Sequence, residues 1–401
     1  MKTTLNMILF LLTVVCFSQT TVNTDMCILE GTQITIADTL NILLEGKVMN
    51  DGELMLKGDL INNGVLSYTS TSNESSIHFT GNLQQVLGQQ NSVFYNVLFN
   101  NTKTILKSSI QVDNDANFTM GIVESEPNEG LFYFNELSDH INTSNLSFVD
   151  GTVLKKGSLD FSFPIGTDNL YRPAFIDNLA GENLISSCYF FQGSNELYPH
   201  NLKEGVIDFI DNQEYWELKR REGDDYAIVT LSRDAATSSA EIMNAALTDL
   251  HIVRWDAAKN YWVDEGGIAI EGNDTVKTIT NVTNYGVYAL GLIRTDQLLP
   301  GDVVVYNNLT PNGDGVNDAL IIKGIERFTD NVVRVFNRWG TKISEIKGYD
   351  NKEKVFKGFA SSDATLQSSK PLPSGTYYYS LDYTTSGKHV KKINYLFING
   401  K

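Results

Sequence analysis

The residues best suited to bind an ion lie close together near position 310. Asn312, Asp314 and Asp318 place three oxygen-bearing side chains within seven positions, with glycines between them. Closely spaced oxygens separated by glycine resemble the first half of a calcium loop, where the ion takes about six to eight oxygen ligands. The closing glutamate of an EF-hand is missing, and a network of Asx turns without metal fits the same residues. Calcium is therefore the one cofactor that the sequence suggests, with these three residues as its ligands.

Motifs of catalysis are absent from the sequence. It contains no Gly-x-Ser-x-Gly elbow, no glycine-rich phosphate loop, no His-Glu-x-x-His and no Cys-x-x-Cys. The five histidines lie far apart, and none has a partner at the spacing of a metal site. We therefore predict no catalytic residues and a protein that is not an enzyme. A glycosidase stays an alternative, because its two carboxylates need only meet in space.

The segment that holds the candidate calcium ligands must be a turn. Residues 309–318 are dense in Pro, Asn, Gly and Asp, and such residues do not form helices or central strands. Strand-like segments follow at residues 332–340 and 372–379, and a last strand runs almost to the end of the chain. The turn is thus expected to open a small β-domain.

These motifs resemble the type B C-terminal sorting domain of the type IX secretion system, also called the gliding motility-associated C-terminal domain. The matching motifs are TPNGDGxND from Thr310, FNRWG from Phe336, PxGTYYY from Pro373 and the closing strand. In one departure, Phe356-Lys357-Gly358 stands where the family usually has Trp-x-Gly. In another, the chain ends on Asn399-Gly400-Lys401 rather than on Arg. The resemblance implies a small β-sandwich over residues 296–401 that the type IX secretion machinery recognises.

The N-terminus carries a second export feature. Met1-Lys2 precedes an apolar run over residues 5–17, which is too short to span a bilayer and is typical of a signal peptide. We predict a signal peptide over residues 1–19, with cleavage after Ser18 or Gln19, and no transmembrane helix in the mature chain. A lipoprotein anchored through Cys16 is the alternative, although Val15 is bulky for the residue before a lipidated cysteine.

Charge is spread unevenly along the chain. Its net charge is −17, yet residues 300–401 hold 14 Lys and Arg against 10 Asp and Glu, a balance of +4. The first 299 residues hold 17 against 38, a balance of −21. Such an acidic body argues against nucleic acid as a partner. Cys27 and Cys188 follow the signal peptide, and an exported location permits a disulfide between them as well as two unpaired thiols.

An internal repeat predicts the first body domain, residues 20–150. Residues 40–47 align with residues 52–59, and Asn50-Asp51-Gly52 returns twelve positions later as Asn62-Asn63-Gly64. Short strands that cannot bury their apolar face alone are expected to stack as a β-helix or β-solenoid. The repeat places Ile42, Leu54 and Leu66 in one inward column and Leu44, Leu56 and Tyr68 in another. A β-sandwich with hairpins of equal length is the alternative.

The second body domain, residues 151–295, has the composition of an antiparallel β-sandwich. Aromatic residues mark strands around Tyr215, His251 and Tyr288. Only residues 235–250 allow an amphipathic helix, and residues 296–301 are expected to form a linker. The overall fold class is thus all-β: solenoid, sandwich and small sorting domain.

These features predict a non-enzymatic scaffold or adhesion module that is secreted or carried to the cell surface. The expected partners are the type IX secretion machinery and, beyond it, surface glycans or other cell-surface proteins. A carbohydrate-binding protein is one alternative, favoured if Trp216, Trp255 and Trp262 are exposed in a row. A divergent polysaccharide-acting enzyme on the solenoid is the other, favoured if carboxylates converge on one sheet face.

Overall fold

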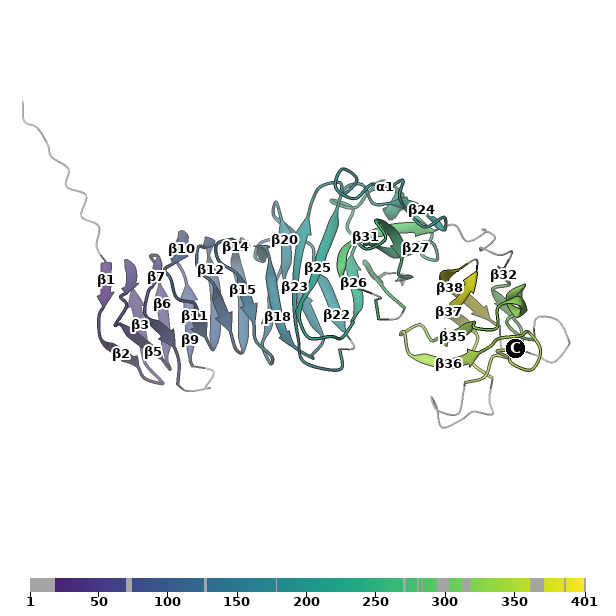
Figure 1. Ribbon diagram of the computed structural model, residues 1–401. Coiled ribbons are helices and arrows are strands. Elements are labelled where there is room, and N and C mark those ends of the chain that lie inside the picture. The colour runs from purple at the N-terminus through teal and green to yellow at the C-terminus, as the bar shows by residue number, and fades with distance from the viewer. Residues whose placement is uncertain are drawn as a thin grey trace, which may run out of the picture.

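Short strands that alternate inward apolar and outward polar residues wind into a β-solenoid of about seven turns at the N-terminal end of the chain (Figure 1). The computed structural model describes residues 19–69, 74–125, 128–177, 179–269, 272–279, 281–282, 284–293, 303–311, 318–360, 371–385 and 387–399. The predicted signal peptide lies outside these residues except for Gln19, and the predicted linker lies outside them entirely. The all-β fold predicted from the sequence is confirmed.

Each turn of the solenoid contributes one strand to each of three parallel ladders. The first turn consists of β1 (Gln19–Val22), β2 (Asp25–Ile28) and β3 (Gln33–Ile36), and the second of β4 (Thr39–Ile42), β5 (Lys47–Asn50) and β6 (Glu53–Leu56). The ladders pair β1 with β4, β2 with β5 and β3 with β6, all in parallel. Residues along each strand alternate between more buried and more exposed positions, because successive side chains point to opposite faces of a strand.

One turn takes about 20 residues, since Gln19 pairs with Thr39. Ile42, Leu54 and Leu66 point inward as predicted, with exposed fractions of 0, 0 and 1%. The predicted columns are wrong, however, because these residues lie on β4, β6 and β8, which belong to three different ladders. Leu44 is 75% exposed, in contrast to the prediction. The twelve-residue similarity therefore relates different sides of the solenoid rather than successive turns.

Aromatic side chains fill the middle of the solenoid. The ring centroids of Phe79 and Phe99 lie 5.4 Å apart, as do those of Phe99 and Phe118. These rings stack along one ladder, in a spacing at which aromatic pairs stabilise a core. The further solenoid strands are β7 (Leu60–Asn62), β8 (Val65–Ser67), β9 (Ser76–Phe79), β10 (Leu83–Leu87), β11 (Ser92–Phe94), β12 (Asn96–Leu106), β13 (Ile110–Val112), β14 (Asp115–Ser125), β15 (Phe132–Phe134), β16 (Asp139–Ile141) and β17 (Val149–Gly151).

The solenoid sheets continue into the antiparallel part of the body. β17 pairs in parallel with β20 (Ile165–Thr167), and β15 pairs in parallel with β18 (Val153–Gly157). β18 in turn pairs antiparallel with β23 (Asn183–Phe190). One hydrophobic core runs from Val22 to Leu290 across this junction. The boundary predicted at residue 150 stays a prediction, and two sheets cross it.

Two sheets make up the antiparallel part. One continues the solenoid in the order β18-β23-β25-β31-β27-β28, with β24 beside β31, and the other has the order β19-β22-β26-β30-β29. Their further strands are β19 (Phe161–Phe163), β22 (Ala174–Asp177), β24 (Ile207–Ile210), β25 (Tyr215–Glu222), β26 (Ile228–Ser232), β27 (Leu250–Asp256), β28 (Tyr261–Asp264), β29 (Ile268–Ala269), β30 (Thr275–Lys277) and β31 (Gly286–Ile293). β21 (Leu170–Tyr171) instead pairs antiparallel with β20 at the end of a solenoid sheet.

A buried ion pair lies in this part of the core. Arg172 donates from Nη2 to Oε1 of Glu214 at 2.9 Å and from Nε to Oε2 at 3.1 Å. The Tyr189 hydroxyl donates to the same carboxylate at 2.8 Å, and Trp216 Nε1 donates to the backbone oxygen of Arg172 at 3.1 Å. Full pairing of this kind is what allows two charges to remain in an apolar interior.

The helix allowed at residues 235–250 is only a single turn, α1 (Ala240–Met243). Before it, the amides of Thr237 and Ser238 donate to the backbone oxygen of Asp234, and the Asp234 carboxylate accepts from Ala236. Such local hydrogen bonds hold the chain in turns and compete with helix. In the part of the chain that the structure describes, we find no helix long and apolar enough to cross a membrane.

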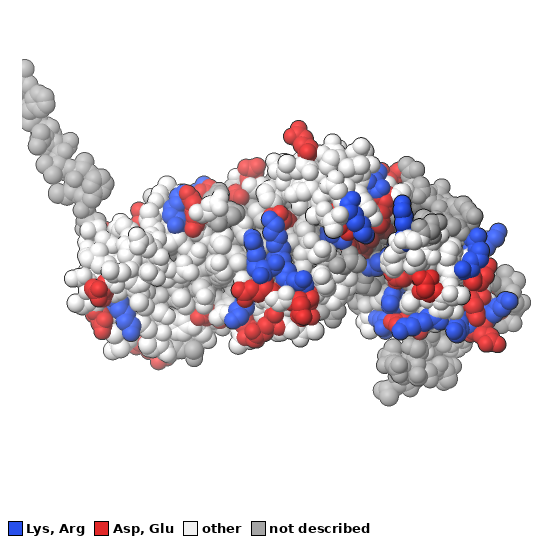
Figure 2. All heavy atoms as spheres, viewed as in Figure 1, with Lys and Arg blue, Asp and Glu red and all other residues white. Residues whose placement is uncertain are grey.

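A small separate core forms the C-terminal domain. Its main sheet has the order β33-β38-β37-β35-β36, and β32 pairs with β34 beside it. The elements are β32 (Val304–Val305), β33 (Asn308–Leu309), β34 (Ile322–Lys323), the 3-10 helix η1 (Ile325–Arg327), β35 (Val332–Phe336), β36 (Lys342–Lys347), β37 (Gly375–Thr385) and β38 (Lys388–Ile398). On the face drawn in Figure 2, charged side chains gather on this domain, whereas much of the solenoid surface is uncharged.

Candidate functional site

The FNRWG motif forms the turn between β35 and β36. The Asn337 side-chain oxygen accepts hydrogen bonds from the amides of Trp339 and Thr341, both at 2.9 Å. Gly340 has φ of +80°, which favours glycine at this position. The turn presents Trp339 outward with an exposed fraction of 65%, and the Arg338 guanidinium lies 4.5 Å from the indole centroid. An Asx-type turn thus fixes an exposed tryptophan in place.

The GTYYY motif begins the longest pairing of the domain. β37 pairs antiparallel with β38 from Gly375 opposite Ile398 to Thr385 opposite Lys388. Tyr379 and Leu381 point into the core with exposed fractions of 1 and 0%. The motif therefore builds the central hairpin of the domain rather than a reactive centre.

Phe356 fills the place where the resembled family usually has tryptophan. Its side chain is buried, and its amide donates to the Tyr349 hydroxyl at 2.9 Å. That hydroxyl donates to the backbone oxygen of Leu320 at 2.5 Å, and burial raises the pKa of Tyr349. The departure in sequence thus keeps an aromatic side chain in the core.

The predicted calcium ligands fall mostly outside the described residues. Asn312 and Asp314 lie outside them, whereas Asp318 is described, two residues before Leu320 enters the core. Among the described residues, no three His, Cys, Asp or Glu side chains stand close enough to hold a metal ion. The calcium site stays a prediction.

A comparison with family models covers the same domain as these motifs. Residues 303–398 match the family model CHU_C, described as a type IX secretion signal domain. The C-terminal domain is a type IX secretion signal domain. A search of the curated proteins found no match, and neither did a search of the solved structures.

The type IX secretion signal domain has two consequences for the whole chain. It implies recognition by the type IX secretion machinery. It also implies a protein that is secreted or carried to the cell surface. Both agree with the resemblance in the sequence, which is confirmed.

The type IX secretion signal domain packs against the body through an apolar cluster. Phe336, Tyr378 and Ile393 of the domain share this cluster with Ile268 and Ile279 of the body. These domain residues lie on β35, β37 and β38, so one face of its main sheet is turned toward the body. The domain is therefore held against the body by side-chain packing.

A buried lysine accompanies this packing. Lys392 has an exposed fraction of 5%, and burial lowers its pKa, whereas Asp264 and Glu204 of the body oppose the shift. Asp264 also holds His251 with 2.6 Å between its Oδ1 and Nδ1. The Lys392 side chain is thus enclosed at the contact with the body, where Asp264 and Glu204 are the carboxyl groups that act on it.

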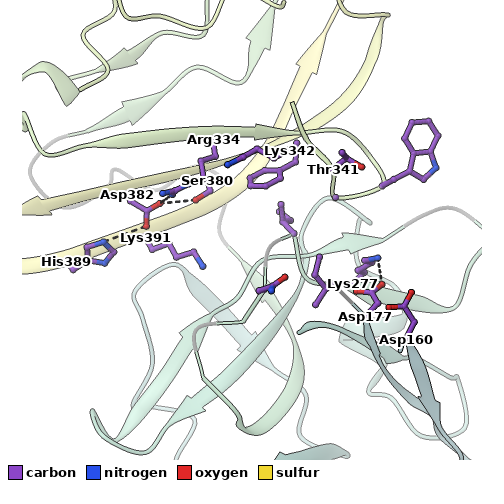
Figure 3. A pocket seen from close by; sticks show the side chains of 16 residues that line it. Asp160, Asp177, Lys277, Arg334, Thr341, Lys342, Ser380, Asp382, His389 and Lys391 are labelled. Carbon is purple, nitrogen blue, oxygen red and sulfur yellow. Dashed lines mark hydrogen bonds and ion pairs between the residues drawn. The ribbon is translucent and has the colours of Figure 1, made fainter. Parts of the chain in front are cut away.

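A cleft of about 890 Å³ opens beside the packed cluster, between the domain and the body (Figure 3). In the body wall, Lys277 and Asp177 form an ion pair of 2.6 Å. In the domain wall, Arg334 and Asp382 form another of 2.6 Å. The further lining residues are Asp160, Ile228, Ile279, Asn281, Phe336, Trp339, Gly340, Thr341, Lys342, Ser380, His389 and Lys391. The cleft combines paired charges, neutral hydrogen-bonding groups and one open aromatic ring.

The tryptophans proposed for sugar stacking serve the core instead. Trp216, Trp255 and Trp262 have exposed fractions of 0, 7 and 0%. They cannot form an exposed row, so they give the carbohydrate-binding alternative no support. The fourth tryptophan, Trp339, is the exposed one. Sequence reasoning used it only as part of a family motif, although its place beside Gly340 in a polar turn indicated exposure.

Carboxylates also meet at the junction of solenoid and antiparallel sheets. Glu124 and Asp150 are paired neighbours on β14 and β17. Burial raises the pKa of Asp150, and Thr167 donates to its carboxylate at 3.2 Å. A hollow of about 360 Å³ opens here, and Asp150, Asp168 and Glu217 are among its lining residues. Asp150 lies on β17, Glu217 on β25 of another sheet and Asp168 outside the strands, so these carboxylates do not share one sheet face and the enzyme alternative stays a hypothesis.

Cys27 and Cys188 are both free. Cys27 is exposed on β2, whereas burial raises the pKa of the Cys188 thiol to about 12. The disulfide alternative is therefore wrong.

Proposed function

We propose that this protein is a non-enzymatic scaffold or adhesion module that a cell displays on its surface or releases. The observation that carries the proposal is the type IX secretion signal domain at residues 303–398. The stacked, aromatic-filled solenoid supports it, because repeats of this kind offer long surfaces on a stiff frame. The exposed faces of the solenoid strands are mostly polar and suit contact with other surface molecules.

Export takes two steps in this proposal. The predicted signal peptide directs the chain across the inner membrane and is removed. The C-terminal domain then presents a folded surface to the type IX secretion machinery. Its compact core, which includes Leu381 and Tyr379, supports recognition as a folded unit.

Deleting residues 303–401 tests the export step in a bacterium that has a type IX secretion system. We expect the truncated chain to accumulate in the periplasm, folded and soluble, whereas the full chain reaches the surface or medium. Fractionation with antibodies against the solenoid measures this. Normal amounts of the truncated chain outside the cell would show that the domain does not direct export here.

Point variants test whether export requires the folded domain or only the presence of its residues. Leu381→Asp places a carboxylate in the domain core, and we expect it to block export as the deletion does. Lys388→Asp changes an exposed residue at the start of β38 and is expected to be exported normally. A fluorescent protein with a signal peptide and residues 294–401 should also leave the periplasm.

A second candidate function, carbohydrate binding, is favoured by Trp339. Open indole rings flanked by hydrogen-bonding groups bind sugars by stacking, and the cleft supplies this combination. We propose a glycan array with the chain that lacks residues 1–18. Binding that is lost in Trp339→Ala but kept in Phe397→Ala would support the cleft, because Phe397 is exposed on the same domain outside it. If the array gave no signal, carbohydrate binding would be refuted and only the scaffold or adhesion role would remain.

A further inference from the structure

The first turn of the solenoid has open strand edges. β1 pairs with β4, β2 with β5 and β3 with β6, and in the described part of the chain no strand pairs with the opposite edges of β1, β2 and β3. These edges form the end of the molecule seen at the purple side of Figure 1. An open strand edge presents unpaired backbone groups that can pair with another strand.

The direction of the backbone hydrogen bonds shows which residues face the opening. The oxygens of Val22, Ile28 and Ile36 accept from amides of the second turn. Since successive residues of a strand direct their backbone groups to opposite sides, Thr21, Cys27 and Thr35 direct theirs away from the solenoid. The three edges therefore offer donors and acceptors around the whole rim of the first turn.

The apolar core is also incomplete at this end. Leu40, Val48 and Leu54 of the second turn have exposed fractions of 0%. Of the inward-pointing apolar residues of the first turn, Val22, Ile28 and Ile36 are buried. Met26 and Ile34, which lie above Val48 and Leu54, stay partly exposed. The end face thus combines a ring of backbone groups with an apolar centre.

The first turn lacks the commonest protections of an edge strand. Natural proteins protect edge strands with charged side chains, lysine above all, with proline or with bulges. Residues 19–38 contain no Lys, Arg or Pro, and their charged residues are Asp25, Glu30 and Asp38. The paired strands of the first turn also run in regular register with the second, without a bulge. This end is therefore built to accept further strands.

We propose that the end face binds the end face of a second copy, giving a two-fold symmetric, head-to-head dimer. Three edges around one rim fit another solenoid end, whereas a single extended peptide covers only one edge. The opposite end of the solenoid continues into β18, β20 and β23, so a head-to-tail contact is blocked. One turn supplies 20 residues, which reaches the roughly 20–30 residues a side of a stable interface.

Proline variants test the hydrogen bonds directly. Proline at Thr21 and Thr35 removes only amides that face the opening, so the bonds between turns are kept. We expect the chain without residues 1–18 to have twice the monomer mass by light scattering and the double variant Thr21→Pro, Thr35→Pro to be a monomer with the same circular dichroism. The matched control, Thr21→Ala with Thr35→Ala, keeps both amides and should remain a dimer. A monomeric parent chain, or a dimeric proline variant, would overturn the proposal.

A distance measurement checks the orientation independently. Cys27 lies on the end face and is exposed, so a spin label on Cys27 in the Cys188→Ser variant reports the contact. Head-to-head pairing brings two labels within the width of one solenoid and gives a strong dipolar signal. A dimer without that signal would be joined elsewhere and would refute the proposed interface.

Discussion

Ile393 of the signal domain lies against Gly266 of the body, so closely that a Cβ on the glycine would come within 2.8 Å of the isoleucine Cγ2. Gly266 has φ of +84°, so both its backbone and its neighbour require glycine. The type IX secretion signal domain therefore packs directly against the body of the same chain.

Ile393→Lys should release the signal domain from the body. The substitution places an ammonium group in the apolar cluster with Ile268 and Ile279, and an unpaired buried charge is costly. We expect small-angle X-ray scattering to show a longer and more variable particle while both parts stay folded. Phe397→Lys, on the same strand but 43% exposed, should leave the scattering curve unchanged. Identical curves for both variants would mean that this cluster does not hold the domain.

Glu214→Ala should strongly destabilise the body. The substitution leaves the Arg172 guanidinium buried without its carboxylate, and loss of one partner of a buried pair costs about 3–5 kcal/mol. Urea unfolding followed by circular dichroism measures the loss. Glu129→Ala breaks the half-exposed pair with Lys107 and should cost less than about 1 kcal/mol. Equal effects would contradict the burial of the Arg172 pair.

The stability of the body should depend on the protonation of Asp211. Burial raises the pKa of this fully buried carboxyl from 3.8 to about 6, with Glu214 adding to the shift. Because the folded state holds the proton more tightly than the unfolded state, Asp211 contributes a loss of stability as pH rises from about 4 to about 6. Asp211→Asn should reduce the loss of stability over this pH range without abolishing it, because burial also raises the pKa of Glu204, to about 7. Exposed Asp224→Asn should keep the full loss. Chemical unfolding at several pH values decides between them.

Leu56 and Leu44 should differ sharply in tolerance to charge. Leu56 has no exposed surface, and Leu44 is 75% exposed. Leu56→Asp buries a carboxylate in the solenoid and should cost several kcal/mol, whereas Leu44→Asp should be nearly neutral. Thermal melts of both variants measure this. A destabilised Leu44→Asp would restore the inward column that the twelve-residue repeat predicted.

Calcium should stabilise the signal domain if Asn312, Asp314 and Asp318 bind it. A ligand that binds only the folded state raises the melting temperature by mass action. We expect a chelator to lower the calorimetric transition of the domain in the full chain and calcium to restore it. Asp318→Asn should weaken the response. A transition that does not respond to chelator or calcium would leave a metal-free turn.

The sequence predicted the class of each region because its signals are local. The alternating strands around Leu40 and Leu54 point their apolar residues inward as predicted, and the motifs from Phe336 and Pro373 lie on strands of the signal domain. The stacking register predicted from the repeat was wrong, because successive turns of the solenoid differ in length. Asp25 pairs with Lys47, 22 residues later, whereas Lys47 pairs with Val65, 18 residues later. A fixed repeat does not describe such spacing.

The candidate site could not be predicted, because it is formed by contacts that no local sequence pattern reveals. Trp216 and Trp339 are both aromatic residues in strand-rich segments, yet one is fully buried and the other is 65% exposed. Glu124 and Asp150 meet only because two solenoid strands stack. The cleft requires Lys277 and Arg334 from parts of the chain that fold around separate cores. Contacts of this kind join residues that are far apart in the sequence, so they depend on the tertiary structure and no sequence pattern predicted them.

The crosswise strands of the solenoid decide how it responds to force. Because the strands lie across the long axis, the hydrogen bonds between turns run along that axis. A pull on the two ends of the body therefore loads these bonds in tension, one turn at a time, instead of shearing many together. Each turn that opens releases about 20 residues, or roughly 70 Å of extended chain. A solenoid with this construction lengthens in steps under load, and the force along it stays near the force that opens one turn.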